Sequence, residues 1–300
     1  MERLITVLTP TYDRGEELKS LFASLQAQTR FNFEWLVVDD GSRDDTRRLV
    51  AAFARQAAFP VRYIHQENGG KHTALNRGIP AVSTELTFIV DSDDTVTPDG
   101  MEVIESYYNK YREDASVGVL SFLRCSRQNG VILKMPQDEC IGTYVSERVR
   151  ADRPGDMAEV FRTAALAAFP FPQFAGERFL SEDVVWIPMG LAYKSVFINR
   201  EIYCFDYLPD GLTRNDKKHK FASPLGSMLR GKMLMKRECG LKANVRGAIL
   251  YNCYRHAADV AHRAIPEQVV LQTAREKMLS FFMWLPGWIF YRKWRPVRED

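Results

Sequence analysis

The chain has 300 residues, of which 46% are hydrophobic, 26% charged and 12% aromatic. These values exclude a disordered chain, a collagen-like repeat and a small disulfide-rich domain, and they allow one large α/β domain with or without an appendage. The formal net charge of +3 conceals an asymmetry. Residues 1–225 hold 27 Lys+Arg against 32 Asp+Glu, whereas residues 226–300 hold 14 against 6, so an acidic body (−5) carries a basic C-terminal part (+8).

The cysteines and the apolar segments restrict the compartment and the membrane topology. The five cysteines are odd in number and lack the paired short spacing of a zinc site or a redox dithiol, so we expect a reduced, cytoplasmic chain. Met1–Tyr12 enters a strand-like run without a signal peptide. The longest apolar stretch, Leu279–Tyr291, has 13 residues including Pro286 and Gly287. A bilayer requires about 20, so we expect no spanning helix.

The first hundred residues alternate short β-rich runs with helical patterns, as in a parallel α/β sheet. Strands are predicted over Leu4–Thr9, Trp35–Asp39, Val61–Gln66 and Leu86–Val90. Helices are predicted over Glu16–Gln28, Arg47–Ala57, Lys71–Val82 and Gly100–Asp114. All four strands end in polar residues, and ligands of open α/β sheets bind beyond the carboxyl ends of the strands.

The pattern changes after residue 116. A hairpin is predicted from Val117–Cys125 and Val131–Lys134 around Gln128-Asn129-Gly130, which makes the sheet mixed. Further predictions are a surface loop over Phe169–Phe179, a helix over Leu180–Leu191 despite Pro188, and one or two strands over Tyr193–Tyr207. The charge shift and Ser223-Pro-Leu-Gly226 place a boundary near residue 225, and residues 226–300 are expected to be helical.

The strongest chemical signal is an apolar strand that ends in three carboxylates, Asp91, Asp93 and Asp94. Such carboxylates repel one another when buried together, unless a cation or full solvation compensates them. Oxygen ligands favour a hard ion such as Mg²⁺ or Mn²⁺, completed by substrate phosphates. The alternative is an acidic turn that caps the next helix. A second pair, Asp39 and Asp40, ends the second strand, which strengthens the interpretation as a site.

Four segments together carry a resemblance to a known family. They are Val7–Arg14, Val37–Thr46, Asn68–Gly78 and Val90–Asp94, and they lie within roughly residues 1–115. With them, the chain resembles an inverting family 2 glycosyltransferase of the bacterial cell-surface polysaccharide type. The resemblance implies a GT-A fold, which is a Rossmann-like mixed α/β sheet flanked by helices, with a C-terminal helical extension. It also implies a nucleotide-sugar-binding half (1–115), an acceptor-binding half (116–225) and the extension (226–300).

The resemblance assigns the donor pocket. Pro10, Thr11 and Tyr12 would line the nucleotide, which is expected to belong to a UDP-sugar. Asp39 would accept a hydrogen bond from the uracil ring, and Asp40 would lie beside it.

The resemblance also assigns the groups around the diphosphate. Asp93 would hold the Mn²⁺ or Mg²⁺ that bridges the diphosphate, and Asp91, which would face the ribose or the donor sugar, is the second candidate metal ligand. Lys71 would lie near the donor sugar or the phosphates, although an exposed lysine at a helix start is the alternative. Arg214, Lys217, Lys218, His219 and Lys220 form a basic cluster that either closes over the diphosphate or is solvated surface charge.

A carboxylate must take the proton of the acceptor hydroxyl, which is a poor nucleophile at neutral pH. Glu182-Asp183 resembles the family's Glu-Asp motif at the head of a helix, in which the aspartate is the base. Asp183 would therefore be the base, and Glu182 would contact the acceptor. The alternative is a capped helix N-terminus at Ser181-Glu-Asp.

The implied reaction is a single in-line displacement with inversion at the anomeric carbon. One rival function is a sugar-phosphate nucleotidyltransferase, which usually has a glycine-rich phosphate loop where this chain has Thr9-Pro-Thr-Tyr12. Another is a non-catalytic subunit that binds a nucleotide-sugar or a polysaccharide. Nucleic-acid binding is not expected, because the body is acidic and the basic residues of the tail are interleaved with Leu, Met and Trp.

The C-terminal segment Phe281–Arg295 places aromatic residues beside basic ones. This combination is typical of an interfacial anchor on an anionic leaflet. We therefore expect a peripheral protein on the inner face of the cell membrane, and a glycan or polyprenyl-linked acceptor. The alternative is that the aromatic residues pack on the catalytic domain or on a second subunit of an oligomer.

Overall fold

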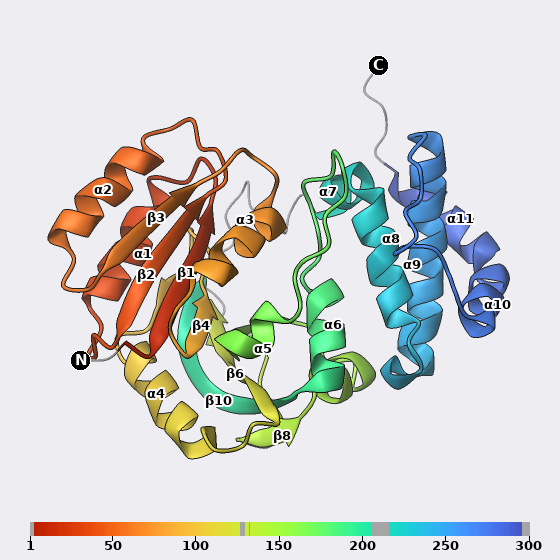
Figure 1. Ribbon diagram of the computed structural model, residues 1–300. Coiled ribbons are helices and arrows are strands. Elements are labelled where there is room, and N and C mark those ends of the chain that lie inside the picture. The colour runs from red at the N-terminus through yellow and green to blue at the C-terminus, as the bar shows by residue number, and fades with distance from the viewer. Residues whose placement is uncertain (1–2, 127–129, 132, 206–215, 296–300) are drawn as a thin grey trace. The chain divides into compact units, whose positions relative to one another are not determined.

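The computed structural model describes residues 3–126, 130–131, 133–205 and 216–295 (Figure 1). The chain divides into two compact units. The first contains Met1–Thr143, Arg153–Pro170 and Met189–Asp206, and the second contains Tyr144–Asp152, Phe171–Pro188 and Tyr207–Asp300. The roles predicted for residues 1–115, 116–225 and 226–300 stay predictions.

The first unit is built on one mixed sheet. Its parallel half has the order β3 (Val61–His65), β2 (Phe33–Asp39), β1 (Ile5–Thr11) and β4 (Leu86–Ile89). The sheet continues through β9 (Met157–Arg162), β6 (Val117–Ser126), β10 (Lys194–Phe205) and β5 (Thr95–Val96). Strand β9 is antiparallel to both of its neighbours, whereas β6 and β10 are parallel. The predicted mixed sheet is confirmed.

Two short strands complete the sheet outside this path. Strand β7 (Gly130–Val131) pairs antiparallel with β6, and β8 (Cys140–Gly142) pairs antiparallel with β10. The predicted hairpin is therefore present, although Gln128 and Asn129 of its turn lie outside the described residues. Tyr193–Tyr207 forms the single strand β10 in its described part.

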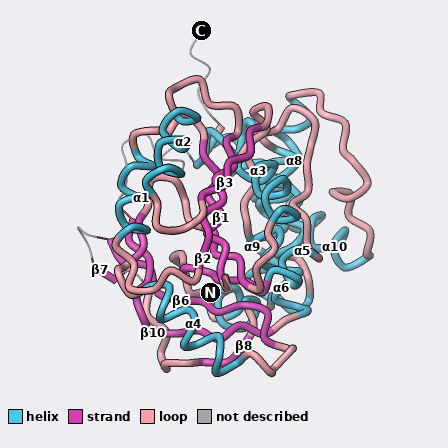
Figure 2. Tube along the Cα trace, turned by 60° about the vertical axis from the view of Figure 1, so that its left-hand side comes forward, coloured by secondary structure: helices cyan, strands magenta, loops and turns pink. Residues whose placement is uncertain are grey.

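Helices α1 (Glu17–Gln26), α2 (Thr46–Gln56) and α4 (Gly100–Tyr111) pack on one face of the sheet. Figure 2 shows α1 and α2 beside the strands β1, β2 and β3. Their apolar residues recur at helical spacing and join the strand residues that point to the same face, such as Ile5, Trp35 and Phe88, in one core. The predicted helices are confirmed, with ends that differ by a few residues.

Helix α3 (Lys71–Gly78) packs on the opposite face and continues as a 3₁₀ turn over Ile79–Ala81. At Gly78, an added Cβ would lie 2.6 Å from Leu8 Cδ1 and 2.9 Å from Val38 Cγ2. This close approach requires glycine, and it holds the C-terminal end of α3 against β1 and β2. The short helix α5 (Thr163–Ala167) follows β9.

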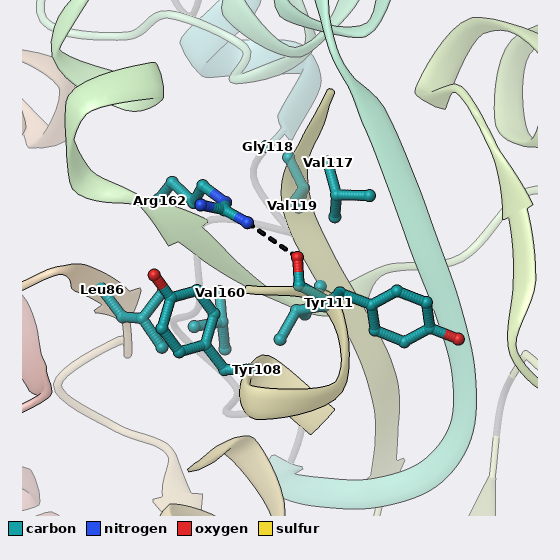
Figure 3. Close-up of a pocket in the computed structure, with 9 residues that line it drawn as sticks. Leu86, Tyr108, Tyr111, Val117, Gly118, Val119, Val160 and Arg162 are labelled. Atoms are coloured by element: carbon teal, nitrogen blue, oxygen red, sulfur yellow. Dashed lines mark hydrogen bonds between the residues drawn. The ribbon is translucent and has the colours of Figure 1, made fainter. Parts of the chain in front are cut away.

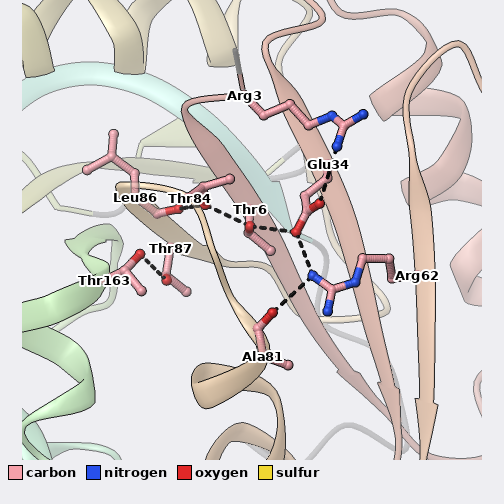
Figure 4. Close-up of polar contacts among 9 residues, drawn as sticks. All are labelled: Arg3, Thr6, Glu34, Arg62, Ala81, Thr84, Leu86, Thr87 and Thr163. Carbon is pink, nitrogen blue, oxygen red and sulfur yellow. Dashed lines mark hydrogen bonds and ion pairs between the residues drawn. The ribbon is translucent and has the colours of Figure 1, made fainter.

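Glu34 is a carboxylate buried inside the parallel sheet (Figure 4). Its Oε1 accepts hydrogen bonds from Thr6 Oγ1 (3.1 Å) and from Arg62 Nη1 (2.9 Å), which come from the strands on either side. The ion pair and the hydrogen bonds compensate the loss of hydration. Glu34 is therefore a structural carboxylate of the sheet.

The second unit is mainly helical. It contains α7 (Asp216–Ala222), α8 (Pro224–Leu234), a 3₁₀ turn (Arg237–Cys239), α9 (Leu241–Val260), α10 (Ala274–Phe282) and α11 (Trp284–Trp294). Helix α6 (Asp183–Ala192) contributes to both units, and a π-helical turn spans Val145–Arg150. Gly231 and Gly247 let α8 and α9 touch through their backbones, because an added Cβ on either glycine would lie within 2.7 Å of the other's carbonyl oxygen. None of the described helices combines the length and the apolarity that crossing a membrane would require.

The segment Phe169–Phe179 has no helix or strand and is exposed at several positions, as predicted for a surface loop, but it also buries some of its side chains. Phe171, Phe174 and Glu177 are buried. The carboxylate of Glu177 accepts hydrogen bonds from the amides of Leu225 (2.8 Å) and Gly226 (2.9 Å) at the start of α8. The loop is thus a packed element that caps a helix.

Candidate active site

The carboxyl ends of β1, β2, β3 and β4 meet at one edge of the sheet, because these four strands are parallel. We call this edge the carboxyl edge. Pro10 and Thr11 end β1, and Tyr12 follows and is partly exposed. Thr11 is buried, and its Oγ1 has no hydrogen-bond partner among the described residues. A buried hydroxyl without a partner at this edge is available to a ligand.

Asp39 ends β2 and is 1% exposed. Its Oδ2 accepts a hydrogen bond from Tyr63 Oη (2.5 Å), and its Oδ1 accepts one from the amide of Ser42 (2.8 Å). Burial and the neighbouring carboxylate of Asp39 raise the pKa of Tyr63, so the tyrosine stays protonated and remains a donor. Asp39 therefore holds the turn after β2, and each oxygen keeps a lone pair for a further donor.

Asp40 holds the loop between β3 and α3. Its Oδ1 accepts hydrogen bonds from Gln66 Nε2 (2.7 Å) and from the amide of Gly69 (2.9 Å), and its Oδ2 accepts one from the amide of Gly70 (2.7 Å). Lys71, the first residue of α3, follows directly. Asp40 thus fixes the loop that presents Lys71 at the carboxyl edge.

Lys71 and Asp91 form an ion pair, with 2.5 Å between Lys71 Nζ and Asp91 Oδ1. Burial by itself would raise the pKa of Asp91, but the charges of Lys71 and Arg124 outweigh it and lower the pKa. Asp91 is therefore ionised at neutral pH. The structure thus brings Asp91 together with Lys71. Asp40, at the end of β2, holds the loop that precedes Lys71.

Asp93 has weaker compensation: within the described part of the chain its carboxylate forms no ion pair, although the charges of Arg14 and Lys71 favour its ionised form. Burial and the negative charge of Asp91 raise the pKa of Asp93. No three His, Cys, Asp or Glu side chains among the described residues form a group that could hold a metal. Two neighbouring carboxylates, of which one forms no ion pair among the described residues, nevertheless fit a Mg²⁺ or Mn²⁺ ion that would take its other ligands from a diphosphate and water.

Asp183 is the first residue of α6 and belongs, like Glu182, to the second unit. Its Oδ2 accepts a hydrogen bond from Arg230 Nε (2.6 Å) of α8. Its Oδ1 is buried and has no hydrogen-bond partner among the described residues. The guanidinium of Arg230 therefore pairs with one oxygen of the carboxylate and orients it, while the other oxygen is left without a hydrogen-bond partner in the described part of the chain.

Comparisons with known proteins decide the family. The family model "Glycosyl transferase family 2" matches residues 6–146. The chain is 32% identical to glycosyltransferase GlyG of Streptococcus pneumoniae serotype 4 over 218 residues, which cover 68% of this chain and 71% of GlyG. This chain belongs to glycosyltransferase family 2. A 34% identical match to glycosyltransferase GlyA of the same organism covers 38% of this glycosyltransferase and 16% of GlyA.

Solved structures confirm the GT-A fold of the glycosyltransferase. Residues 1–349 of TarS from Staphylococcus aureus in complex with UDP-GlcNAc match with a TM-score of 0.64 at 16% identity, covering 99% of this chain and 94% of that chain. A match to the whole TarS chain covers 54% of it. The mannosyltransferase PcManGT from Pyrobaculum calidifontis, in complex with GDP-Man and Mn²⁺, matches with a TM-score of 0.57 at 15% identity, covering 97% and 88%.

Two residues that contact the acidic turn of the glycosyltransferase were not predicted. Arg124 of β6 and Tyr203 of β10 both contact Asp94, which is buried beside Asp91. Burial, followed by the charge of Asp91, raises the pKa of Asp94 to about 7. No local pattern marks these partners, because they lie 30 and 109 residues further along the chain.

A small hollow in the first unit lies at the amino end of β4, at the opposite end of that strand from Asp91 (Figure 3). Arg162 lines it and donates hydrogen bonds to the carbonyls of Tyr111 (2.8 Å), Arg112 (2.7 Å) and Asp114 (3.1 Å). The guanidinium thus caps the C-terminus of α4. This hollow has a structural explanation and is not part of the glycosyltransferase site.

The predicted basic cluster is only partly described, since Arg214 lies outside the described residues. In α7, the ammonium of Lys217 lies 5.7 Å from the ring centre of Trp294. The ring of His219 stacks on Phe179 at 6.1 Å. These contacts place both side chains within the second unit, and a role of the cluster toward a diphosphate stays a prediction.

Proposed function

We propose that this glycosyltransferase moves a sugar from a UDP-sugar to an acceptor hydroxyl with inversion, assisted by Mn²⁺ or Mg²⁺. The observation that carries the proposal is the carboxyl edge. There, Thr11 has a buried hydroxyl without a hydrogen-bond partner among the described residues. Asp39 and Asp40 hold the loops on either side of it. Lys71 supplies a positive charge, and Asp91 and Asp93 supply negative ones. The UDP-GlcNAc complex of TarS and the GDP-Man and Mn²⁺ complex of PcManGT, which share the fold, support a nucleotide-sugar donor.

On the donor side, we assign the nucleotide to the ends of β1 and β2. Pro10, Thr11 and Tyr12 line it, and Asp39 accepts a hydrogen bond from the uracil ring. Lys71 faces the diphosphate, whose negative charge an ammonium group stabilises. Asp93 and Asp91 would hold the metal, which when bound neutralises charge on the departing diphosphate.

On the acceptor side, we assign the proton to Asp183. The acceptor oxygen forms a bond to the anomeric carbon as the bond from that carbon to the diphosphate oxygen breaks, and the hydroxyl proton passes to Asp183 Oδ1. Because nucleophile and leaving group lie on opposite sides of the carbon, the configuration inverts. Glu182 contacts the acceptor in this proposal.

Metal removal tests the proposal as a whole. A panel of nucleotide sugars is incubated with the full chain in Mn²⁺, in Mg²⁺ and in chelator, and release of the nucleoside diphosphate is measured. We expect slow hydrolysis of a UDP-sugar that stops in chelator and returns when the metal is restored. Turnover that continues in chelator contradicts the metal assignment. Formation of a nucleotide sugar from a nucleoside triphosphate and a sugar phosphate would identify the nucleotidyltransferase, and donor binding without turnover would identify a binding subunit.

We also propose that α10 and α11 bind an anionic membrane surface, and that the acceptor is a lipid-linked or growing surface glycan. This helix pair packs on Asn252 of α9. In α11, a Cβ added to Gly287 would lie 2.4 Å from Asn252 Cβ, and in α10 the carbonyl of Ser280 accepts a hydrogen bond from Asn252 Nδ2 (2.8 Å). The helix pair also exposes large apolar side chains, one of which, Trp284, contacts His256 of α9 at its ring; we call this set the aromatic face: Met278, Phe281, Phe282, Trp284, Leu285, Trp288 and Ile289.

Charge complementarity supports lipid as the partner of the aromatic face. The exposed cations Lys277, Arg292, Lys293 and Arg295 lie in or next to the same two helices. The carboxylate of Glu276, the acidic residue of α10, accepts hydrogen bonds from the amides of Gln272 and Thr273 at the start of that helix. Aromatic rings at the headgroup boundary and cations against lipid phosphate together favour an anionic leaflet. The predicted location on the inner face of the cell membrane stays a prediction.

Two exposed phenylalanines allow a test that spares the fold. Phe281 and Phe282 are 77% and 65% exposed. We expect Phe281→Ser with Phe282→Ser to weaken cosedimentation with phosphatidylglycerol-containing vesicles at least about tenfold, because two rings no longer enter the interface. The control is Leu241→Ser, which removes an equally exposed (75%) apolar side chain from the first residue of α9. Equal binding by both variants contradicts the proposal, and a change in oligomeric state would assign the aromatic face to a second copy.

A further inference from the structure

The acidic turn Asp91–Asp94 follows β4 and is held by side chains from two other strands of the sheet, β6 and β10. We propose that Tyr203 and Arg124 are positioning residues that clamp this turn, so that Asp91 and Asp93 are kept in place for a divalent cation. The inference rests on the metal site of the proposed function. Its four members, Tyr203, Arg124, Asp91 and Asp94, all belong to the first unit.

The hydroxyl of Tyr203 bridges the two ends of the turn. It accepts a hydrogen bond from the amide of Asp91 (3.1 Å) and donates one to Asp94 Oδ2 (2.6 Å). The turn also closes on itself, since the amide of Asp94 donates to the carbonyl of Asp91 (3.2 Å). The residues at either end of the turn are therefore tied to one buried side chain, which limits the movement of the backbone between them.

Arg124 completes the clamp. Its Nη2 lies 2.8 Å from Asp94 Oδ2, and its guanidinium stacks on the ring of Tyr203 at 4.0 Å and on that of Phe205 at 5.1 Å. The stacking fixes the plane of the guanidinium and the position of the tyrosine ring. Arg124 also neutralises the charge of Asp94, the nearest additional carboxylate. The other two carboxylates of the turn are Asp93, which forms no ion pair among the described residues, and Asp91, which pairs with Lys71, and these two are the ones left for a metal.

The sheet explains how two remote residues reach the turn. Tyr203 of β10 is directly opposite Arg124 of β6, and it also pairs with Val96 of β5, the strand into which the turn runs. The register of β10 against β6 shifts between Ile198 and Glu201 and again before Tyr203. Irregularities of this kind bend a strand and redirect a side chain near an active site. Here they accompany a tyrosine that points to the turn.

Tyr203→Phe tests the clamp, because it removes the hydroxyl and leaves the ring under Arg124. Binding of Mn²⁺ is measured by electron paramagnetic resonance with the full chain in the presence of UDP, and UDP-sugar hydrolysis is measured over a range of Mn²⁺ concentrations. We expect the apparent Mn²⁺ dissociation constant to rise about tenfold, since loss of a supporting hydrogen bond costs a metal site tenfold or more. At saturating Mn²⁺, kcat should return to within about twofold of wild type.

The matched control is Tyr108→Phe in α4. Tyr108 is also buried, and its hydroxyl also donates to a carboxylate, that of Glu85 (2.6 Å), but it has no contact with the turn. The control should leave Mn²⁺ binding unchanged. If Tyr203→Phe does not fold, Arg124→Lys replaces it, because lysine keeps the charge but loses the planar stacking, and the same rise is expected.

The outcomes separate this inference from the proposed function. Equal Mn²⁺ binding by wild type and a folded clamp variant overturns the clamp and leaves the metal site standing. A lower kcat at every Mn²⁺ concentration, with unchanged Mn²⁺ binding, also overturns it and indicates a structural role alone. If the wild-type chain binds UDP but takes up no Mn²⁺ beside it, the metal site of the proposed function is overturned, and the clamp with it.

Discussion

Asp183→Asn is expected to reduce glycosyl transfer at least about a hundredfold, because the acceptor hydroxyl then has no base. Donor affinity should stay within about twofold of wild type, since the role proposed for Asp183 is toward the acceptor. Asparagine is chosen over alanine because its carbonyl oxygen can still accept the hydrogen bond from Arg230 Nε, which lies 2.6 Å from the aspartate. Alanine would leave the arginine without its ion-pair partner and confound the result. Transfer is measured with an acceptor that wild type uses, and donor affinity by titration with UDP-sugar.

The control for this variant is Asp259→Asn in α9. Asp259 also pairs with an arginine of the second unit, Arg255, with 3.1 Å between Asp259 Oδ1 and Arg255 Nε, but this pair is on the surface. Loss of this exposed ion pair costs little free energy of unfolding, and glycosyl transfer should be unchanged. If Asp183→Asn transfers sugar at the wild-type rate, Asp183 is not the base. If Asp183→Asn lowers both glycosyl transfer and donor affinity, Asp183 supports the structure of the whole site, and the variant is no evidence that it is the base.

Asp93→Asn is expected to abolish the metal response of the site. Hydrolysis of the UDP-sugar should fall at least about a hundredfold at moderate Mn²⁺ concentrations, because an amide oxygen is a far weaker ligand for a hard cation than a carboxylate is. The same substitution removes a partly buried charge that burial and Asp91 disfavour. Without metal, the variant should therefore unfold at the wild-type temperature or above it. Activity is measured against Mn²⁺ concentration, and unfolding by calorimetry with and without the metal.

A carboxylate remote from the carboxyl edge serves as the control for Asp93→Asn. Asp114, in the turn after α4, accepts hydrogen bonds from the amide (2.9 Å) and the hydroxyl (2.6 Å) of Ser116. Asp114→Asn should keep the metal response. A variant of Asp93 with normal Mn²⁺ dependence would remove this residue from the metal site. A variant that unfolds well below the wild-type temperature would assign Asp93 a structural role instead.

The elements of the first hundred residues could be predicted because their signals are local. Alternating β-rich runs and helical spacing mark the strands and helices, and turn residues mark their ends, as in Gly41-Ser42 after β2. The carboxyl edge follows from the same information, since parallel strands bring their carboxyl ends together. Asp39, Asp40, Lys71, Asp91 and Asp93 were candidates for this reason.

Some features had no local signal. Phe171 and Phe174 lie in a segment rich in proline, which is typical of a surface loop, yet both are buried in the second unit. Arg124 and Tyr203 are ordinary strand residues in the sequence. Their contacts depend on the pairing of β6 with β10 and on the register shifts within β10.

By itself, the sequence determined the order of the elements, the family and the carboxylates of the acidic turn, because each depends on residues that are close together in the chain. The tertiary structure alone decided which cations and hydrogen-bond donors compensate those carboxylates and the carboxylate of Asp183. Lys71 pairs with Asp91, Arg124 and Tyr203 hold Asp94, and Arg230 pairs with Asp183. The physical reason is that electrostatic interactions depend on distance in space and on burial, and strand pairing and helix packing set both.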